Sequence, residues 1–214
     1  MTVKSKIPKP AEELAETGRE FFSRGWIRAD SGNFSLLLAR KPMRLCITSA
    51  GDKTGVLDET NFLEIDDDAE ILHGFGRPAD ETLLHLTIYR LQPKARCILF
   101  SQSVSGMIVW NTHFVDGAVR IRGYELLKGL SGVESHDHTE IVPIVENSQD
   151  HLALSHVVEN VLLENAHIHG IFIRRHGFYS WGESVAAAQR NIEIFEFFWE
   201  VLERMPPSDG RGKL

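Results

Sequence analysis

The apolar side chains of this chain recur in two rhythms, one of about 3.6 residues and one of two, which predict helices and strands respectively. The helical rhythm is clearest near the end of the chain, at Val185, Ala188, Ile192, Phe195, Trp199 and Leu202. These residues form one stripe of a helix over 183–205, and we expect the stripe to pack on a sheet, with a subunit contact as the alternative. Similar patterns predict helices at 10–24, 81–91, 124–130 and 149–164.

Short apolar runs lie between these helices and predict strands. They occupy 33–39, 44–48, 97–102, 117–122 and 141–145, and the segment 170–181 alternates like a hairpin. Many short strands with hairpin-like connections, interspersed with helices, are typical of an α/β layered domain with a mostly antiparallel or mixed sheet. We find no internal repeat. We expect one domain over 1–214, with an ordered core at about 10–203 and a polar tail at 206–214.

The composition narrows the class of protein. A chain of 214 residues, 43% of them hydrophobic, can bury one sizeable core. Thirty acidic residues against 23 basic ones give a formal charge of −7, which argues against nucleic-acid binding, because phosphate neutralisation needs a basic surface. The two cysteines, Cys46 and Cys97, lie in apolar runs and predict buried thiols in a reducing cytoplasm. No apolar run approaches the roughly 20 residues that span a bilayer, so we expect no membrane contact.

Six blocks of residues, in order along the chain, carry candidate chemistry. They are Ser31–Ser35, Ile47–Lys53, Glu81–His85, Gly123–Lys128, Pro143–Asp150 and Arg174–Gly182. With these blocks the chain resembles the class II aldolase/adducin superfamily over about residues 10–203, and within it the methylthioribulose-1-phosphate dehydratases of methionine salvage. The Gly-Tyr-Glu sequence at 123–125 and the Arg-Arg-His-Gly-x-Tyr-x-Trp-Gly sequence at 174–182 are specific to the dehydratase branch.

The resemblance implies an α/β/α fold and a homotetramer whose active sites lie between neighbouring subunits. It also implies a lyase reaction, the removal of water from the phosphorylated sugar 5-methylthioribulose 1-phosphate. In the family, zinc held by three histidines polarises the sugar carbonyl while a carboxylate moves the proton. On this pattern Glu125 is the catalytic acid/base, in a site apolar enough to raise its pKa, and His176 is a zinc ligand. The expected substrate-binding residues are Asn33, Ser35, Gly51 and Lys53.

The metal-binding strand departs from the family pattern. A strand ending in His-x-His places two imidazoles on one face, and in this chain those two positions hold Phe100 and Gln102. His176, even with His85 or Glu81 nearby, makes a poor zinc site, because tight binding in the family rests on three nitrogens at roughly 2.0–2.1 Å. We therefore expect zinc to bind weakly or not at all. We also expect Phe100 to lie beside His176 and to fill the space of the metal.

The phosphate-binding loops depart from the pattern as well. The family usually offers hydroxyl groups at positions where this chain has Asp30, Ala50 and Ala79, and Asp80 adds another negative charge. The lysine of the glycine loop, Lys53, stands one place early. Acidic side chains repel a phosphate dianion. Three hypotheses stay open: a sugar-phosphate lyase with a rebuilt or metal-free site, a scaffold or regulatory homologue that keeps the fold and the oligomer, and a lyase for a different, uncharged substrate.

Two further pairs of histidines have the spacing of metal ligands on a strand. These are His167 with His169, and His136 with His138. Neither pair falls at a ligand position of the family, so we expect all four to be surface histidines.

Overall fold

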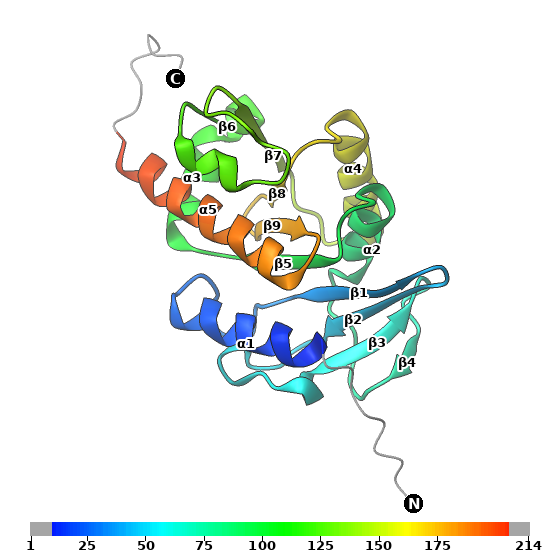
Figure 1. Ribbon diagram of the computed structural model, residues 1–214. Helices are drawn as coiled ribbons and strands as arrows, with labels where there is room; N and C mark the ends of the chain where they lie inside the picture. Colours follow the sequence, from blue (N-terminus) through cyan, green and yellow to red (C-terminus); the bar gives the residue numbers. More distant parts are fainter. Residues whose placement is uncertain (1–9, 206–214) are drawn as a thin grey trace, which may run out of the picture.

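The computed structural model of the protein describes residues 10–205 (Figure 1). Residues 1–9 and the predicted tail at 206–214 lie outside that part. The helices are α1 (Pro10–Ser23), α2 (Thr82–Leu91), α3 (Val104–His113), α4 (His151–Glu164) and α5 (Val185–Arg204), and the short 3-10 helices are η1 (Thr54–Val56), η2 (Glu59–Asn61), η3 (Phe114–Asp116) and η4 (Glu125–Gly129). The strands are β1 (Ser35–Arg40), β2 (Met43–Thr48), β3 (Phe62–Asp66), β4 (Ile71–His73), β5 (Cys97–Ser101), β6 (Ala118–Arg122), β7 (Thr139–Val145), β8 (Gly170–Ile173) and β9 (Gly177–Gly182). The sequence patterns did not predict α3, β3 or β4.

The strands form one sheet in the order β4-β3-β2-β1-β5-β9-β8-β7-β6. Neighbouring strands are antiparallel except β7 and β8, which run parallel. The mostly antiparallel, mixed sheet is therefore confirmed. β5 and β9 are neighbours in the middle of the sheet, with Cys97 opposite Gly182 at one end and Ser101 opposite Phe178 at the other.

Helices cover both faces of the sheet (Figure 1). Successive residues of β9 point to opposite faces: the ring of Phe178 lies 4.8 Å from that of Phe195 in α5, and Tyr179 lies 5.8 Å from His85 in α2. α2 packs with α4, and α5 packs with α1 and α3. The protein thus has the three-layer α/β/α arrangement that the resemblance implied.

The apolar stripe of α5 packs on the sheet, as the spacing predicted. Trp199 is fully buried, and its ring lies 4.7 Å from that of Phe172 and 5.3 Å from that of Phe178. Ser184 caps the start of the helix by accepting a hydrogen bond from the backbone N–H of Ala187. Over residues 10–205, no helix is both long enough and apolar enough to cross a membrane.

Gly182, at the end of β9, touches the first turn of α5. A Cβ atom at this position would lie 2.4 Å from the backbone nitrogen of Ala188 and 2.7 Å from the carbonyl carbon of Ala187. Because backbone atoms cannot rotate away, Gly182→Ala is expected to lower the free energy of unfolding by about 1–3 kcal/mol, measured by urea denaturation. Gly129→Ala is the matched control, since its nearest new contact is the movable Cδ1 of Ile194. Equal losses in the two variants would contradict this explanation.

Candidate active site

Phe100, Gln102 and His176 come together at one end of the central strands, as predicted. His176 lies in the turn between β8 and β9, and its ring centroid is 5.3 Å from that of Phe100. Gln102, just after β5, donates a hydrogen bond from Nε2 to the carbonyl oxygen of His176 at 2.5 Å. Phe100 is 1% exposed and packs against the imidazole, while the amide of Gln102 is turned to the backbone.

A buried chain of hydrogen bonds leads from His176 through Tyr179 into the protein. Asn33 donates from Nδ2 to the hydroxyl of Tyr179 at 3.2 Å, and its Oδ1 accepts from Nε2 of His85 at 2.8 Å. Nδ1 of His85 is then left to accept from the Ser35 hydroxyl at 2.7 Å, and Tyr89 donates to the Ser35 carbonyl at 3.0 Å. Burial lowers the pKa of His85 to about 3, so the ring is neutral and takes this one tautomer. Asn33 and Ser35 are buried in this chain, and their contact with substrate stays a prediction.

The accessible end of the hydrogen-bond chain is the pair of His176 and Glu81. Nε2 of His176 lies 2.9 Å from the Tyr179 hydroxyl and 3.4 Å from Oε1 of Glu81. Burial lowers the pKa of His176, and the negative charge of Glu81 opposes that shift. Burial also raises the pKa of Tyr179 well above its ordinary value, so the phenol keeps its proton. The imidazole therefore sits between a neutral phenol and a carboxylate, an arrangement that can accept or donate a proton.

The loop after β2 and the loop before α2 lie side by side near this pair. The backbone N–H of Ala50 donates to the carbonyl of Arg77 at 2.8 Å, and Gly51 takes the left-handed conformation, with φ +83°. Arg77 forms an ion pair with Asp80, and this hydrogen bond lowers the pKa of the Asp80 carboxyl. The charge of Asp80 therefore has a counter-charge in Arg77, a partner that the sequence did not predict. Substrate contacts of Gly51 and Lys53 stay predictions.

Glu125 is not brought to His176 within one chain. It opens η4 with its side chain 69% exposed, forms an ion pair with Lys128, and lies 3.2 Å from Nδ1 of His136. The hydrogen bond from Lys128 and its charge lower the pKa of Glu125, whereas the sequence analysis expected an apolar environment that raises it. That expectation is wrong for the single chain, because the carboxylate is in solvent beside two basic groups.

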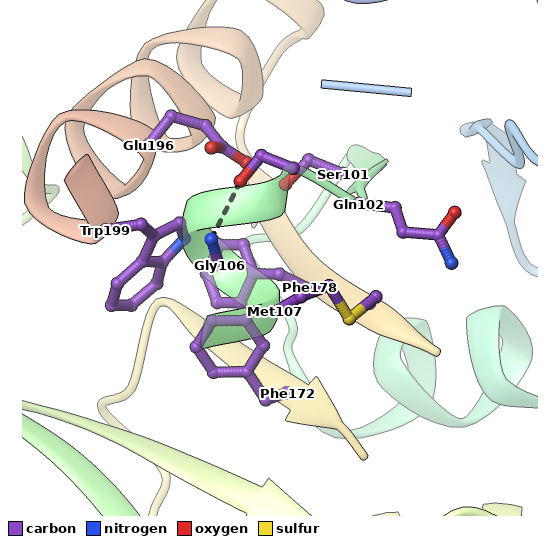
Figure 2. Close-up of a pocket in the computed structure, with 10 residues that line it drawn as sticks. Ser101, Gln102, Gly106, Met107, Phe172, Phe178, Glu196 and Trp199 are labelled. Atoms are coloured by element: carbon purple, nitrogen blue, oxygen red, sulfur yellow. Dashed lines mark hydrogen bonds between the residues drawn. The ribbon is translucent and has the colours of Figure 1, made fainter. Parts of the chain in front are cut away.

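A small pocket lies on the other side of β5, facing α5 (Figure 2). Glu196 of α5 points toward Ser101, and both of its carboxyl oxygens are buried without a hydrogen-bond partner among the described residues. Burial raises the pKa of Glu196 to about 7, although the nearby hydroxyls of Ser101 and Ser103 act to lower it. Sequence reasoning missed this carboxyl. The available signal was a glutamate set among the aromatic residues of the stripe.

The comparison with known families decides the assignment. A family model described as "Class II Aldolase and Adducin N-terminal domain" matches residues 12–202. The chain belongs to the class II aldolase/adducin family.

Relatives within this family match about nine-tenths of the chain. A methylthioribulose-1-phosphate dehydratase of Methylococcus capsulatus (strain ATCC 33009 / NCIMB 11132 / Bath) is 38% identical over 91% of this chain and 93% of its own. One of Pseudoalteromonas translucida (strain TAC 125) is 36% identical over 90% of each. These relatives confirm that the chain is similar to the dehydratase branch of the family.

Solved structures that superpose on the chain support the fold. YgbL of Escherichia coli, a putative aldolase/epimerase/decarboxylase, superposes with a TM-score of 0.77 at 22% identity, covering 92% of this chain and 90% of its own. L-fuculose-1-phosphate aldolase of Thermus thermophilus gives a TM-score of 0.69 at 19% identity, covering 89% of this chain and 91% of its own. At these identities the agreement concerns the fold of the family alone.

Proposed function

We propose that the protein is a dehydratase-type lyase that acts on methylthioribulose 1-phosphate or a closely related sugar phosphate, through a site that lacks the three-histidine zinc centre. The observation that carries the proposal is the pair of His176 and Glu81, backed by Tyr179 at the corner where the family holds its metal. Similarity to the dehydratases over nine-tenths of the chain supplies the substrate class.

The residues present fit a zinc site poorly. The ring of Phe100 packs on the imidazole of His176, Gln102 bonds to the backbone, and Nε2 of His176 already faces Tyr179 and Glu81. Within residues 10–205, no three or more His, Cys, Asp or Glu side chains are arranged to hold a metal ion. One imidazole replaces the three nitrogens on which tight zinc binding rests. We therefore propose that zinc binds weakly or not at all, and no step below depends on it.

Dehydration beside a carbonyl needs a group that polarises the oxygen and a base that removes the neighbouring proton. His176 can supply the first function when it is protonated and donates to the substrate oxygen, and the negative charge of Glu81 stabilises that protonated form against the effect of burial. Glu125, the proposed acid/base, takes the proton of a C–H bond next to the carbonyl, and the electron pair of that bond expels the hydroxyl on the next carbon. Glu125 then returns the proton to the departing hydroxyl, which leaves as water. The enol that remains becomes the second ketone. Imidazolium is a weaker electrophile than a metal ion, so this route predicts slow turnover.

Glu125 is the proposed acid/base, reaching the site of a neighbouring subunit in a homotetramer. Its side chain is 69% exposed on the single chain and lies beside Lys128 and His136, which supports a role across an interface. Burial there would remove water from the carboxylate and raise its pKa toward the value that proton transfer requires. The buried thiols of Cys46 and Cys97 are compatible with the cytoplasm as the proposed location.

A second candidate is a scaffold or regulatory homologue without chemistry. The observation that favours it is Phe100, whose buried ring occupies the corner where the family has a ligand. This candidate keeps the sheet, the helices and the oligomer. It predicts that the sugar phosphate is not turned over, even when the protein is folded and assembled.

The test is an assay of diketone formation from methylthioribulose 1-phosphate by the purified protein treated with a chelator. We expect slow turnover that survives the chelator and falls about 100-fold or more in Glu125→Gln, the size of a general acid–base contribution. Glu134→Gln, another exposed glutamate in a nearby loop, is the matched control and should leave the rate unchanged. Absence of turnover in the folded, assembled protein would favour the scaffold, and loss of turnover with the chelator would contradict the metal-free site.

A further inference from the structure

A second cavity, of about 720 Å³, opens at the opposite end of the central strands from His176. It lies where β9 ends at Gly182 and the chain enters β5 at Cys97, whereas His176 adjoins the other end of the same two strands. Four steps along a strand at about 3.3 Å place the two ends about 13 Å apart. The cavity is therefore separate from the candidate active site, and its volume is that of a small-molecule site.

Two histidines of the cavity lining, His138 and His169, are bound to Glu140, which is itself 1% exposed. Its carboxylate accepts from Nε2 of His138 at 2.8 Å and from Nδ1 of His169 at 3.1 Å. The backbone N–H of His169 adds a third hydrogen bond at 3.2 Å. These hydrogen bonds to Glu140 fix the orientation of two imidazoles that line the cavity. The prediction that His169 is a surface histidine is wrong, because its side chain is only 12% exposed.

His169 is held in its charged form. Its second ring nitrogen, Nε2, lies 2.9 Å from the carbonyl oxygen of Ser131, and both this oxygen and the Glu140 carboxylate can only accept. Burial acts to lower the pKa of His169, but the hydrogen bond to Glu140 and its charge outweigh that and raise it. The wall of the cavity thus carries the imidazolium of His169, which Glu140 holds in place and balances in charge.

The cavity combines this wall with basic side chains and apolar surface. Lys94 and Arg190 line it, and Arg190 has no ion-pair partner among residues 10–205. Glu183 is the acidic residue on the lining, and its carboxylate is 3.9 Å from Nζ of Lys94 with both groups mostly exposed. Trp181 adds an aromatic surface. An excess of cations on the lining of a protein whose net charge is −7 indicates a local preference for anions.

We propose that this cavity binds a small organic anion, a carboxylate or phosphate monoester carried on an apolar body. Lys94 and Arg190 would face the anionic group, and Trp181 would contact the apolar part. A metal ion is disfavoured, since the described residues contain no suitable ligand group and both ring nitrogens of His169 are engaged. The inference is independent of the reaction proposed above, because His176 takes no part in it.

The experiment measures binding of phenyl phosphate and phenylacetate to the assembled protein by following the indole signal of Trp181 in ¹⁵N–¹H spectra, assigned with Trp181→Phe. We expect saturable shifts of that signal with one or both anions, and at least about 10-fold weaker binding by Lys94→Gln/Arg190→Gln. Glu183→Gln, which removes the opposing charge, should bind more tightly. Which of the two anions binds better distinguishes a phosphate ligand from a carboxylate one.

Two controls complete the design. Arg204→Gln removes an exposed cation of α5, the helix that also carries Arg190, at a position outside the cavity lining. His176→Ala alters the candidate active site. Neither variant should change the affinity for the anions. The proposal is overturned if Trp181 does not respond at millimolar anion, if the neutral benzyl alcohol binds as tightly as the anions, or if the Lys94→Gln/Arg190→Gln variant binds like the parent.

Discussion

Zinc uptake is expected to rise to about one ion per subunit when the two strand positions are restored together by Phe100→His and Gln102→His. The strand aims both side chains at His176, since Phe100 already touches the imidazole and Gln102 reaches its carbonyl. Three nitrogens would then converge, and the metal would compete with Tyr179 and Glu81 for Nε2 of His176. Metal analysis after dialysis against zinc and then against buffer measures the content.

The control for this variant keeps the two new histidines and adds His176→Ala, which should return zinc to the level of the parent protein. A folded double variant that holds no more zinc than the parent would show that positions 100, 102 and 176 do not form the family's metal site. We expect little gain in dehydration beyond the parent, because Ala50 and Ala79 still offer no hydroxyl to a phosphate. The repair therefore tests the ligand geometry separately from the reaction.

The convergence of these residues could be predicted because each lies in a strongly patterned segment. β5 is a run of buried residues, β9 lies in the specific block 174–182, and the pleat of a strand fixes which side chains share a face. The layered fold and the long apolar stripe of α5 follow from the same local rules. α3 was missed because its sequence has little separation of polar and apolar faces, with Gly106 and β-branched residues inside it.

The polar groups were harder to predict, because their partners come from distant parts of the chain. His85 stands between apolar residues of α2, and its neighbours in the sequence do not indicate that Asn33 binds one ring nitrogen and Ser35 the other. Glu140 and His169 meet in the same way, across β7 and the approach to β8. Periodicity places a side chain on a face of its own element, but pairs of this kind depend on how elements are assembled.

Glu125 illustrates the limit set by a single chain. The sequence block marks it, yet the isolated subunit surrounds it with Lys128, His136 and water, which keep its carboxyl ionised. A catalytic proton carrier needs the opposite environment. If the proposed reaction is correct, the neighbouring subunit must supply that environment, so activity and assembly should be lost together on dilution.

Glu196→Gln is expected to change how stability depends on pH. The carboxyl has a pKa of about 7 in the folded protein, against an ordinary value of 4.5 that the unfolded chain should show. Between these values the folded state keeps the proton and the unfolded state has lost it, so the free energy of unfolding of the parent falls as pH rises from about 4.5 to 7 and then levels off. The full difference is about 3 kcal/mol, at about 1.4 kcal/mol for each pH unit.

The glutamine variant has no proton to lose, so it should escape this decline, and its stability relative to the parent should rise between pH 5 and pH 8.5. Near pH 5 the variant should be less stable than the parent, because burying an amide without a partner costs about 1–3 kcal/mol at every pH. Urea denaturation at pH 5 and pH 8.5 separates the constant cost from the pH-dependent gain. Glu193→Gln, on the same helix but paired with Arg24 near solvent, should keep the pH dependence of the parent. If Glu196→Gln also kept that dependence, the carboxyl would have to be ionised within the fold and held by contacts other than those described for it.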